Sequence, residues 1–206
     1  MIRPPNRAGV AFSDAGDGDL RGAPSRRAVF SSVVGIPAEW AMVKQVHGSV
    51  IERAESPGLI GEADGIWTTK ANLPVAVFTA DCLGVALVAK GATGVAHAGW
   101  RGAAHGVVES LFEEMAAAGF RPTFAAIGPG IGPCCFEVGD EVRARFPDAQ
   151  SSTTWGTPSV DLARHITAGL GIEDLWSAGL CTMHDPGWFS HRRDQTKSRM
   201  AAVAWI

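Results

Sequence analysis

Short apolar runs separated by turn residues dominate the middle of the chain. They predict three strands, Val75–Thr79, Val85–Ala89 and Gly94–His97, with Lys90–Thr93 as the turn between the last two. If neighbouring strands pair antiparallel, the chain goes up to Asp81-Cys82, returns, and goes up again to His97. Legs of about five residues, at about 3.3 Å per residue, are each about 17 Å long. The pattern therefore predicts that Cys82 and His97 meet at one edge of a sheet.

Strand and helix patterns intermix along the rest of the chain. A strand is expected near Gly9–Ser13, then an irregular segment to residue 38, and a strand pair or bent strand over Ala41–Ile51 around His47-Gly48. The later elements are predicted to be a helix over Arg101–Ala118, a strand over Phe124–Ile127, a short helix near Glu141–Phe146, a helix from an Asp161 cap to Leu170, and strands over Ser177–Thr182 and Met200–Ile206. Strict βαβ alternation is missing, which favours a mixed-sheet α/β domain over a Rossmann fold.

Composition and charge narrow the class of protein. The chain has 206 residues, of which 46% are hydrophobic, so a single domain over residues 1–206 can bury a sizeable core. The net charge is −3 and no long Lys/Arg run occurs, which argues against nucleic-acid binding. No apolar stretch approaches the roughly 18 residues of a membrane span. A cytoplasmic monomer that acts on a small molecule is the expectation.

Three candidate metal ligands, His47, Cys82 and His97, stand at predicted strand ends or bends. Each alone would be read as a structural residue. Together they form a His2Cys set, which leaves a fourth position for water or substrate, as in catalytic zinc sites. The alternative without metal makes Cys82 a thiolate nucleophile and His97 its base. A copper oxidase needs several copper ions, and one His2Cys set cannot bind them.

An anion site is predicted beside these ligands, where Gly99 and Gly102 flank the start of the helix. Its free backbone N–H groups favour a negative ligand, and Arg101 adds a bidentate donor, so phosphate fits. The alternative is that the glycines only permit a tight turn and that Arg101 is solvated. Lys44 and Gln45 flank His47 and are candidate substrate-binding residues, although only one of them shares a face with His47 in an unbroken strand.

The other three cysteines, Cys134, Cys135 and Cys181, lack a CxxC spacing. We expect them to be small buried thiols, in preference to a strained disulfide between the vicinal pair. Arg192, Arg193 and Asp194 are expected to form a buried, structural ion-pair network that holds the C-terminal strands.

Several motifs resemble the laccase-domain family, also called multicopper polyphenol oxidase-like or peptidoglycan editing factor proteins. They are KQVHG, TADCLGVALVA, GVAHAGWRGAAHGVVE, IGPGIGPCCFEVGDEV, CTMHDPGWFSHRRD and the tail RMAAVAWI, and they run from about Trp40 to the C-terminus. The resemblance implies a compact α/β fold of layered mixed sheets flanked by helices, also likened to cysteine-hydrolase toxins. It implies that His47, Cys82 and His97 bind zinc, with copper, suggested by the family name, the less favoured metal.

The resemblance also implies purine nucleoside chemistry. The leading hypothesis is a zinc-dependent purine nucleoside phosphorylase with adenosine deaminase and methylthioadenosine phosphorylase activity, in which Arg101 holds phosphate and Asp81 assists proton transfer. One alternative is an amide hydrolase that edits a peptidoglycan precursor, UDP-MurNAc-L-serine, or another Cys/His hydrolase. A further alternative is a non-catalytic binder of nucleotide precursors.

Two regions depart from the family pattern. Residues 12–32 lack the usual Gly-Gly-Val-Ser and the Asn-Leu-Gly stretch that follows it, and His191 stands where Tyr is usual before Arg-Arg-Asp. Substrate contacts from these regions are therefore expected to differ from those of the family, whereas the metal ligands are unaffected.

Overall fold

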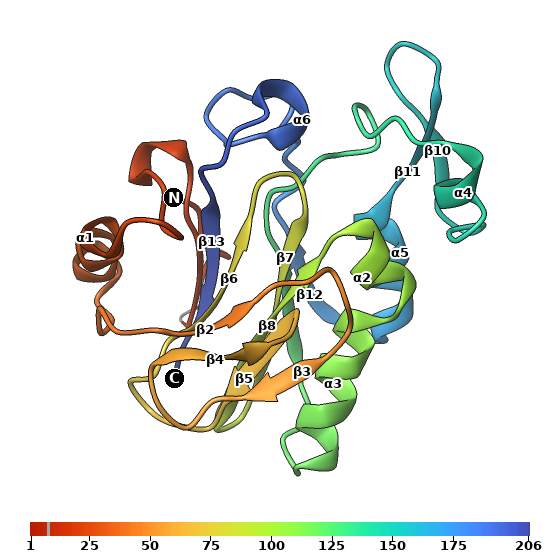
Figure 1. The fold of residues 1–206 in the computed structure, drawn as a ribbon. Helices are drawn as coiled ribbons and strands as arrows, with labels where there is room; N and C mark the ends of the chain where they lie inside the picture. Colours follow the sequence, from red (N-terminus) through yellow and green to blue (C-terminus); the bar gives the residue numbers. More distant parts are fainter. Residues whose placement is uncertain (8) are drawn as a thin grey trace.

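Two mixed β-sheets pack face to face in the computed structural model, which describes residues 1–7 and 9–206 (Figure 1). The five-stranded sheet has the order β1 (Val10–Phe12), β13 (Met200–Ala204), β6 (Val75–Thr79), β2 (Ala41–Lys44) and β4 (Gly58–Glu62). The six-stranded sheet has the order β12 (Asp174–Ser177), β9 (Phe124–Ile127), β7 (Leu83–Ala89), β8 (Ala92–Ala98), β5 (Gly65–Thr68) and β3 (Ile51–Arg53). Each sheet contains both parallel and antiparallel pairs.

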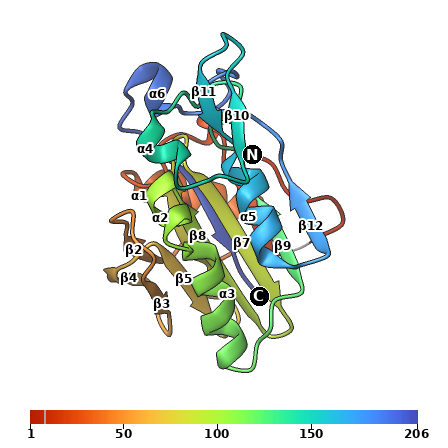
Figure 2. The same cartoon turned by 90° about the vertical axis from the view of Figure 1, so that its right-hand side faces the viewer.

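Helices cover the outer faces of the two sheets (Figures 1 and 2). The helix α1 (Pro24–Val34) lies on the five-stranded sheet, and α2 (Trp100–Ala104), α3 (Val107–Ala117) and α5 (Leu162–Leu170) lie on the six-stranded sheet. The short helices η1 (Ala15–Asp17), α4 (Asp140–Arg143) and α6 (His191–Asp194) and the hairpin of β10 (Gln150–Ser152) and β11 (Pro158–Val160) complete the fold. The predicted α/β fold of layered mixed sheets flanked by helices is confirmed.

Three apolar layers hold this arrangement together. One lies between the sheets and includes Val77 and Val95, and a second lies under α3 and α5 and includes Leu111. The third packs Phe30 of α1 against Trp40, whose indole donates to Ser31 Oγ at 3.0 Å. Because both faces of each sheet are covered, central strands such as β6 are buried along their whole length.

The predicted pairing of the first two central strands is wrong, although their positions are correct. β6 belongs to the five-stranded sheet, whereas β7 and β8 pair antiparallel in the other sheet. The chain crosses between the sheets at Asp81, whose φ of 89° is left-handed. Continuous apolar runs say that a strand is buried but not which neighbour it pairs with, so this crossing was not predictable from the pattern.

Two predicted elements are each divided in the structure, one at Gly106 and the other at the loop that carries His47. The helix expected over Arg101–Ala118 is two helices, because Gly106 adopts a φ of 71° between α2 and α3. The strand pair expected over Ala41–Ile51 is β2 and β3, which lie in different sheets.

Two other predictions were wrong outside the central strands. The segment read as irregular contains α1, whose Val29 and Val33 are 61% and 66% exposed, so its apolar residues do not form a single stripe. The strand expected over Ser177–Thr182 ends instead at Ser177, before Gly179 turns the chain with a φ of 63°.

No helix in residues 1–7 and 9–206 is long and apolar enough to cross a membrane. The helix cap predicted at Asp161 is confirmed, since its side chain accepts the Arg164 N–H at 3.0 Å and α5 ends before Gly171. The buried ion-pair network expected of Arg192, Arg193 and Asp194 is not found, because Arg193 and Asp194 form a single, partly exposed pair and Arg192 donates to the Glu137 carbonyl. Arg193 instead holds the C-terminal region by donating to the carbonyls of Thr182 and Trp188, both at 2.8 Å.

Candidate active site

Three segments bring His47, Cys82 and His97 to the same end of the two sheets. Cys82 directly precedes β7, and His97 lies near the end of β8, where it faces Gly84 across the antiparallel pair. His47 comes from the loop between β2 and β3 and has a left-handed φ of 63°. One ligand atom of each residue lies within 4.8 Å of the others. The prediction that Cys82 and His97 meet is confirmed, and His47 joins them.

A buried carboxylate that the sequence analysis missed, Asp64, organises this group. Its Oδ1 lies 2.8 Å from His97 Nδ1, and its Oδ2 accepts the N–H groups of Val46 at 3.0 Å and Gly48 at 2.7 Å. Asp64 is fully buried and His97 is 3% exposed. One carboxylate therefore directs His97 Nε2 toward Cys82 and fixes the loop that carries His47, as carboxylates that accept the far N–H of a metal-bound histidine do.

The charges in this group support one another. Burial raises the pKa of the Cys82 thiol, but hydrogen bonds with His47 and His97 outweigh burial and lower the pKa to about 6. Burial lowers the pKa of His97, but Asp64 and Cys82 outweigh it and raise the pKa to about 9. Burial also opposes ionisation of Asp64, yet the hydrogen bonds from His97 and the two backbone N–H groups lower its pKa. At neutral pH the metal-free group therefore holds a thiolate beside a charged imidazole.

Open space beside the sulfur completes the geometry of the group. Gly99 precedes α2, and a Cβ atom at this position would lie 2.9 Å from Cys82 Sγ and 3.2 Å from His47 Cδ2. The two imidazole rings meet edge to face, with centroids 4.9 Å apart. Two imidazoles and one thiolate around such a space are the donor set that zinc prefers, so these residues fit a zinc ion.

The three residues open into a cavity of about 650 Å³. This volume is within the range of small-molecule sites. Its wall has aromatic and aliphatic residues that suit a flat apolar ring, and polar residues that suit anions and hydroxyl groups. The lining residues are Arg21, Met42, Val43, Lys44, Gln45, His47, Leu59, Phe78, Ala80, Asp81, Cys82, His97, Trp100, Ile131, Phe136, His191, Arg192 and Arg199.

Three arginines that the sequence analysis did not single out as ligands, Arg21, Arg192 and Arg199, line this cavity. Burial lowers the pKa of Arg199, and the positive charge of Arg21 lowers it further. The backbone N–H groups of Arg21 and Arg199 both donate to Asp19 Oδ1, at 3.1 and 3.0 Å. Two neighbouring cations facing one cavity make a favourable place for an anion. Arg21 and His191 both belong to the regions that depart from the family pattern.

The predicted Asp81, Lys44 and Gln45 line the same cavity, each with a polar partner in the protein. The Asp81 carboxylate accepts the Thr182 hydroxyl at 2.7 Å and the Arg192 backbone N–H at 2.6 Å. The Gln45 amide donates to Phe78 O and accepts Phe78 N–H, both at 2.8 Å. Lys44 Nζ lies 2.6 Å from Glu62 Oε1 on the surface. Gln45 thus extends the contact between β2 and β6 at the cavity wall.

Arg101 lies at the start of α2, where the sequence placed a phosphate site. It is exposed, and its guanidinium lies 4.3 Å from the centroid of the Trp100 ring. Trp100 lines the cavity, whereas Arg101 is outside the set of lining residues found in the described part of the chain. Arg101 follows His97 by four residues in the sequence, but its side chain is not part of the cavity wall.

Comparison with known proteins decides the family. The family described as multi-copper polyphenol oxidoreductase laccase matches residues 13–206. The chain belongs to this family. The resemblance noted in the sequence motifs is thereby confirmed for the laccase family. The matched range includes every residue of the candidate active site.

Relatives in the laccase family carry a more specific name. The chain is 36% identical to a protein named purine nucleoside phosphorylase ORF3 of Streptomyces griseus, over 82% of this chain and 75% of the relative. It is 35% identical to a purine nucleoside phosphorylase of Deinococcus radiodurans, over 95% of this chain and 81% of the relative.

Solved structures share the laccase-family fold. YlmD from Geobacillus stearothermophilus superposes with a TM-score of 0.78 at 29% identity, covering 89% of this chain and 80% of that chain. The hypothetical protein YfiH of Bacillus licheniformis superposes with a TM-score of 0.84 at 23% identity, covering 96% of this chain and 92% of that chain, and this likeness concerns the fold alone.

Proposed function

We propose that this protein is a zinc-dependent purine nucleoside phosphorylase that also deaminates adenosine and cleaves methylthioadenosine. The observation that carries the proposal is the convergence of His47, Cys82 and His97 on a cavity that also contains three arginines. The names of the relatives at about 35% identity support the same activity.

His47, Cys82 and His97 are the residues that would hold zinc. A bound zinc ion would supply a Lewis acid with one coordination position left for a substrate or water. With zinc bound, the hydrogen bond to Asp64 would keep His97 in the tautomer whose Nε2 is free to bind the metal, and Asp64 also holds the His47 loop through two backbone N–H groups. We assign Asp64 as a positioning residue of the site.

Phosphorolysis needs an anion and a nucleoside side by side. An oxygen of phosphate forms a bond to ribose C1′ while the bond from C1′ to the purine nitrogen breaks, and the purine takes up a proton. Arg199 and Arg21 face the cavity as neighbouring cations, which suits the phosphate. Phe78 and Phe136 offer apolar ring surface for the purine.

Arg101 and Asp81 keep their predicted roles as proposals. Arg101, beside Trp100, would guide phosphate at the mouth of the cavity. Asp81 would assist proton transfer, and its hydrogen bond from the Arg192 backbone also holds α6 over the site. Lys44 and Gln45 would contact the substrate from β2 and the loop that follows it.

The decisive assay incubates the zinc-loaded protein with adenosine, with and without phosphate, and follows adenine, inosine and hypoxanthine. Adenine that appears only with phosphate is the expected result of phosphorolysis, and inosine without phosphate is that of deamination. Formation of neither product, by protein with a full zinc content, would refute the nucleoside proposal.

The arrangement of Cys82, His97 and Asp64 favours a second candidate, a thiolate hydrolase. A thiolate, an imidazole beside it and a carboxylate 2.8 Å from the far ring nitrogen are the parts of a nucleophilic triad. This hydrolase would cleave an amide such as the serine-containing peptidoglycan precursor. A covalent acyl adduct on Cys82, trapped on metal-free protein by mass spectrometry, would support it, and zinc should then inhibit the reaction.

A further inference from the structure

A second group of three sulfur atoms lies outside the candidate active site. One Sγ atom each from Cys134, Cys135 and Cys181 lies within 4.8 Å of the others. All four cysteines of the chain are free thiols. Cys134 and Cys135 follow β9, whereas Cys181 follows β12, so residues almost fifty positions apart in the sequence converge here.

Backbone hydrogen bonds hold the three thiols in place. The turn that carries Cys134 and Cys135 is closed by Cys135 N–H and Phe136 N–H, which donate to Gly132 O at 3.0 and 2.9 Å. Cys181 is fixed against the same turn, because Thr182 N–H donates to Gly130 O at 3.0 Å and Gly130 N–H donates to Leu180 O at 3.3 Å. The group is therefore largely preorganised for a ligand.

Gly132 lies beside two of the sulfur atoms and contributes a donor. Its backbone N–H points to Cys181 Sγ, with a nitrogen–sulfur distance of 3.3 Å. A Cβ atom at Gly132 would lie 3.4 Å from both Cys134 Sγ and Cys181 Cβ, which is ordinary contact. An N–H donor at this position stabilises negative charge on the sulfur, as it does around metal-bound thiolates.

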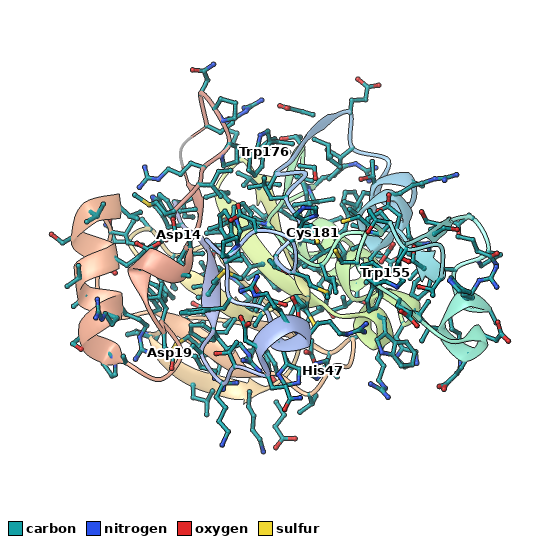
Figure 3. The ribbon with its side chains drawn as sticks, turned by 90° about the horizontal axis from the view of Figure 1, so that it is seen from above. Asp14, Asp19, His47, Trp155, Trp176 and Cys181 are labelled. Carbon is teal, nitrogen blue, oxygen red and sulfur yellow. The ribbon has the colours of Figure 1, made fainter. Side chains whose placement is uncertain are left out.

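Access comes from a second cavity of about 390 Å³, which Cys134 and Cys181 line together with Arg164 and Asp161. Arg164 brings a positive charge to this cavity, which favours an anionic thiolate complex, and the Asp161 carboxylate caps α5 by accepting the Arg164 N–H. Ile131 lines both cavities and separates them. Viewed from the end of the sheets, His47 lies beside α6, whereas Cys181 lies closer to the middle of the molecule (Figure 3).

We propose that Cys134, Cys135 and Cys181 form a second metal site, a trithiolate site for a soft monovalent cation of the Cu(I) class. Within residues 1–7 and 9–206, no histidine or carboxylate joins these thiols as a further ligand. Three thiolates without a nitrogen or oxygen donor suit a soft ion, whereas structural zinc takes four protein ligands. Binding transfers no electrons: each thiol that becomes a ligand releases its proton to water.

The test is an anaerobic titration of the reduced, zinc-loaded full chain with Cu(I) in competition with a chromogenic Cu(I) chelator. The wild-type protein should take one equivalent of Cu(I) from the chelator without losing zinc, and ultraviolet thiolate-to-Cu(I) absorption should appear. Cys134→Ser and Cys181→Ser should each lose that equivalent. Circular dichroism checks that each variant is folded.

The matched control is Cys82→Ser, which alters only the candidate active site. It should keep the equivalent of Cu(I) while zinc binding falls. Equal Cu(I) uptake by the wild type and both folded variants would overturn the proposal, as would uptake that needs Cys82. A disulfide between two of the three thiols, formed with an added oxidant and two hydrogen atoms lighter in mass, should block Cu(I) uptake; uptake that survives this oxidation would also contradict the site.

Discussion

Two groups of three side chains each place sulfur beside a cavity, and the groups differ in the residues that surround the sulfur. The first group is His47, Cys82 and His97, and the second is Cys134, Cys135 and Cys181. At the first, Cys82 lies between two imidazoles, and although burial raises its pKa, the hydrogen bonds with His47 and His97 lower it to about 6. At the second, burial and the neighbouring thiols Cys134 and Cys181 raise the pKa of Cys135 to about 12. Burial also raises the pKa of Cys181, but the backbone N–H of Gly132 and the thiol of Cys134 are among the donors that outweigh burial and lower it. Imidazole donors therefore favour a thiolate at Cys82, whereas Cys135, which has only thiols beside it, stays protonated.

The two groups also differ in how they are supported. A buried carboxylate, Asp64, orients His97 of the first group and holds the loop that carries His47. The second group is supported by backbone hydrogen bonds around Gly130 and Gly132. The first resembles an open catalytic metal site, and the second resembles a site that only binds. The following changes test this contrast, from the largest expected effect to the smallest.

Alkylation should separate the two groups most strongly. In metal-free protein at pH 7, iodoacetamide should modify Cys82 more than about 1,000-fold faster than Cys135, because only the thiolate reacts. The Cys82 rate should fall as the pH drops through about 6, where the thiolate takes up a proton. Peptide mass spectrometry measures both rates. Equal reactivity of the two thiols would remove the contrast.

Cys82→Ser should lower the rate of phosphorolysis and the affinity for zinc by more than about 100-fold. Loss of a residue that binds the metal should cost at least as much as loss of a group that is hydrogen-bonded to such a residue. Cys134→Ser, in the second group, is the matched control and should leave both quantities unchanged. Steady-state kinetics and elemental analysis measure them. A loss of activity in both variants would mean that the two groups act together.

Asp64→Asn should lower zinc affinity by about 10- to 100-fold, because the amide is a poorer acceptor for His97 and the His47 loop. Asp161→Asn, beside the second cavity, should bind zinc as the wild type does, since asparagine caps a helix as well as aspartate does. Competition with a zinc chelator measures the affinities. If Asp64→Asn holds zinc as tightly as Asp161→Asn, the carboxylate has no positioning role.

Arg199→Ala should raise the KM for phosphate by about 10- to 100-fold, because a hydrogen bond to a charged group contributes roughly 1.5–3 kcal/mol. Arg164→Ala, in the second cavity, should leave this KM unchanged. Arg101→Ala ranks the two candidate phosphate ligands: a larger rise than in Arg199→Ala would place phosphate at the start of α2 instead of deeper in the cavity.

Gly99→Ala should have the smallest effect, a loss of about 1–3 kcal/mol in the free energy of unfolding together with weaker zinc binding, because the new methyl group crowds Cys82. Gly139→Ala is its control, since a Cβ there meets no atom within 4 Å. Denaturant unfolding and zinc titration measure both variants. Equal behaviour would show that the space beside Cys82 is not needed.

The sequence predicted the parts of the site that depend on local pattern. Strands Val75–Thr79 and Phe124–Ile127 have the predicted bounds, because apolar runs between turn residues mark buried strands. Cys82 and His97 meet as predicted even though β6 and β7 lie in different sheets, since both residues still follow or end strands that reach the same edge.

Long-range features were beyond the sequence pattern. Asp64 stands in EADGIW just before β5, and only the three-dimensional fold shows that its carboxylate reaches His97, so no local signal marks it. Arg21 lies in a segment rich in Gly and Asp that reads as irregular, yet it faces the cavity. The three cysteines of the second group looked like packing residues because their convergence depends on the contact between Gly130 and Cys181.

Zinc-edge X-ray absorption on zinc-loaded Cys134→Ser protein tests the central claim most directly, because this variant lacks the complete second group. His47, Cys82 and His97 predict one sulfur at about 2.3 Å and two nitrogens at about 2.0 Å around zinc. A first shell of two or more sulfurs, or of oxygen alone, would contradict the assignment of this group as the zinc site.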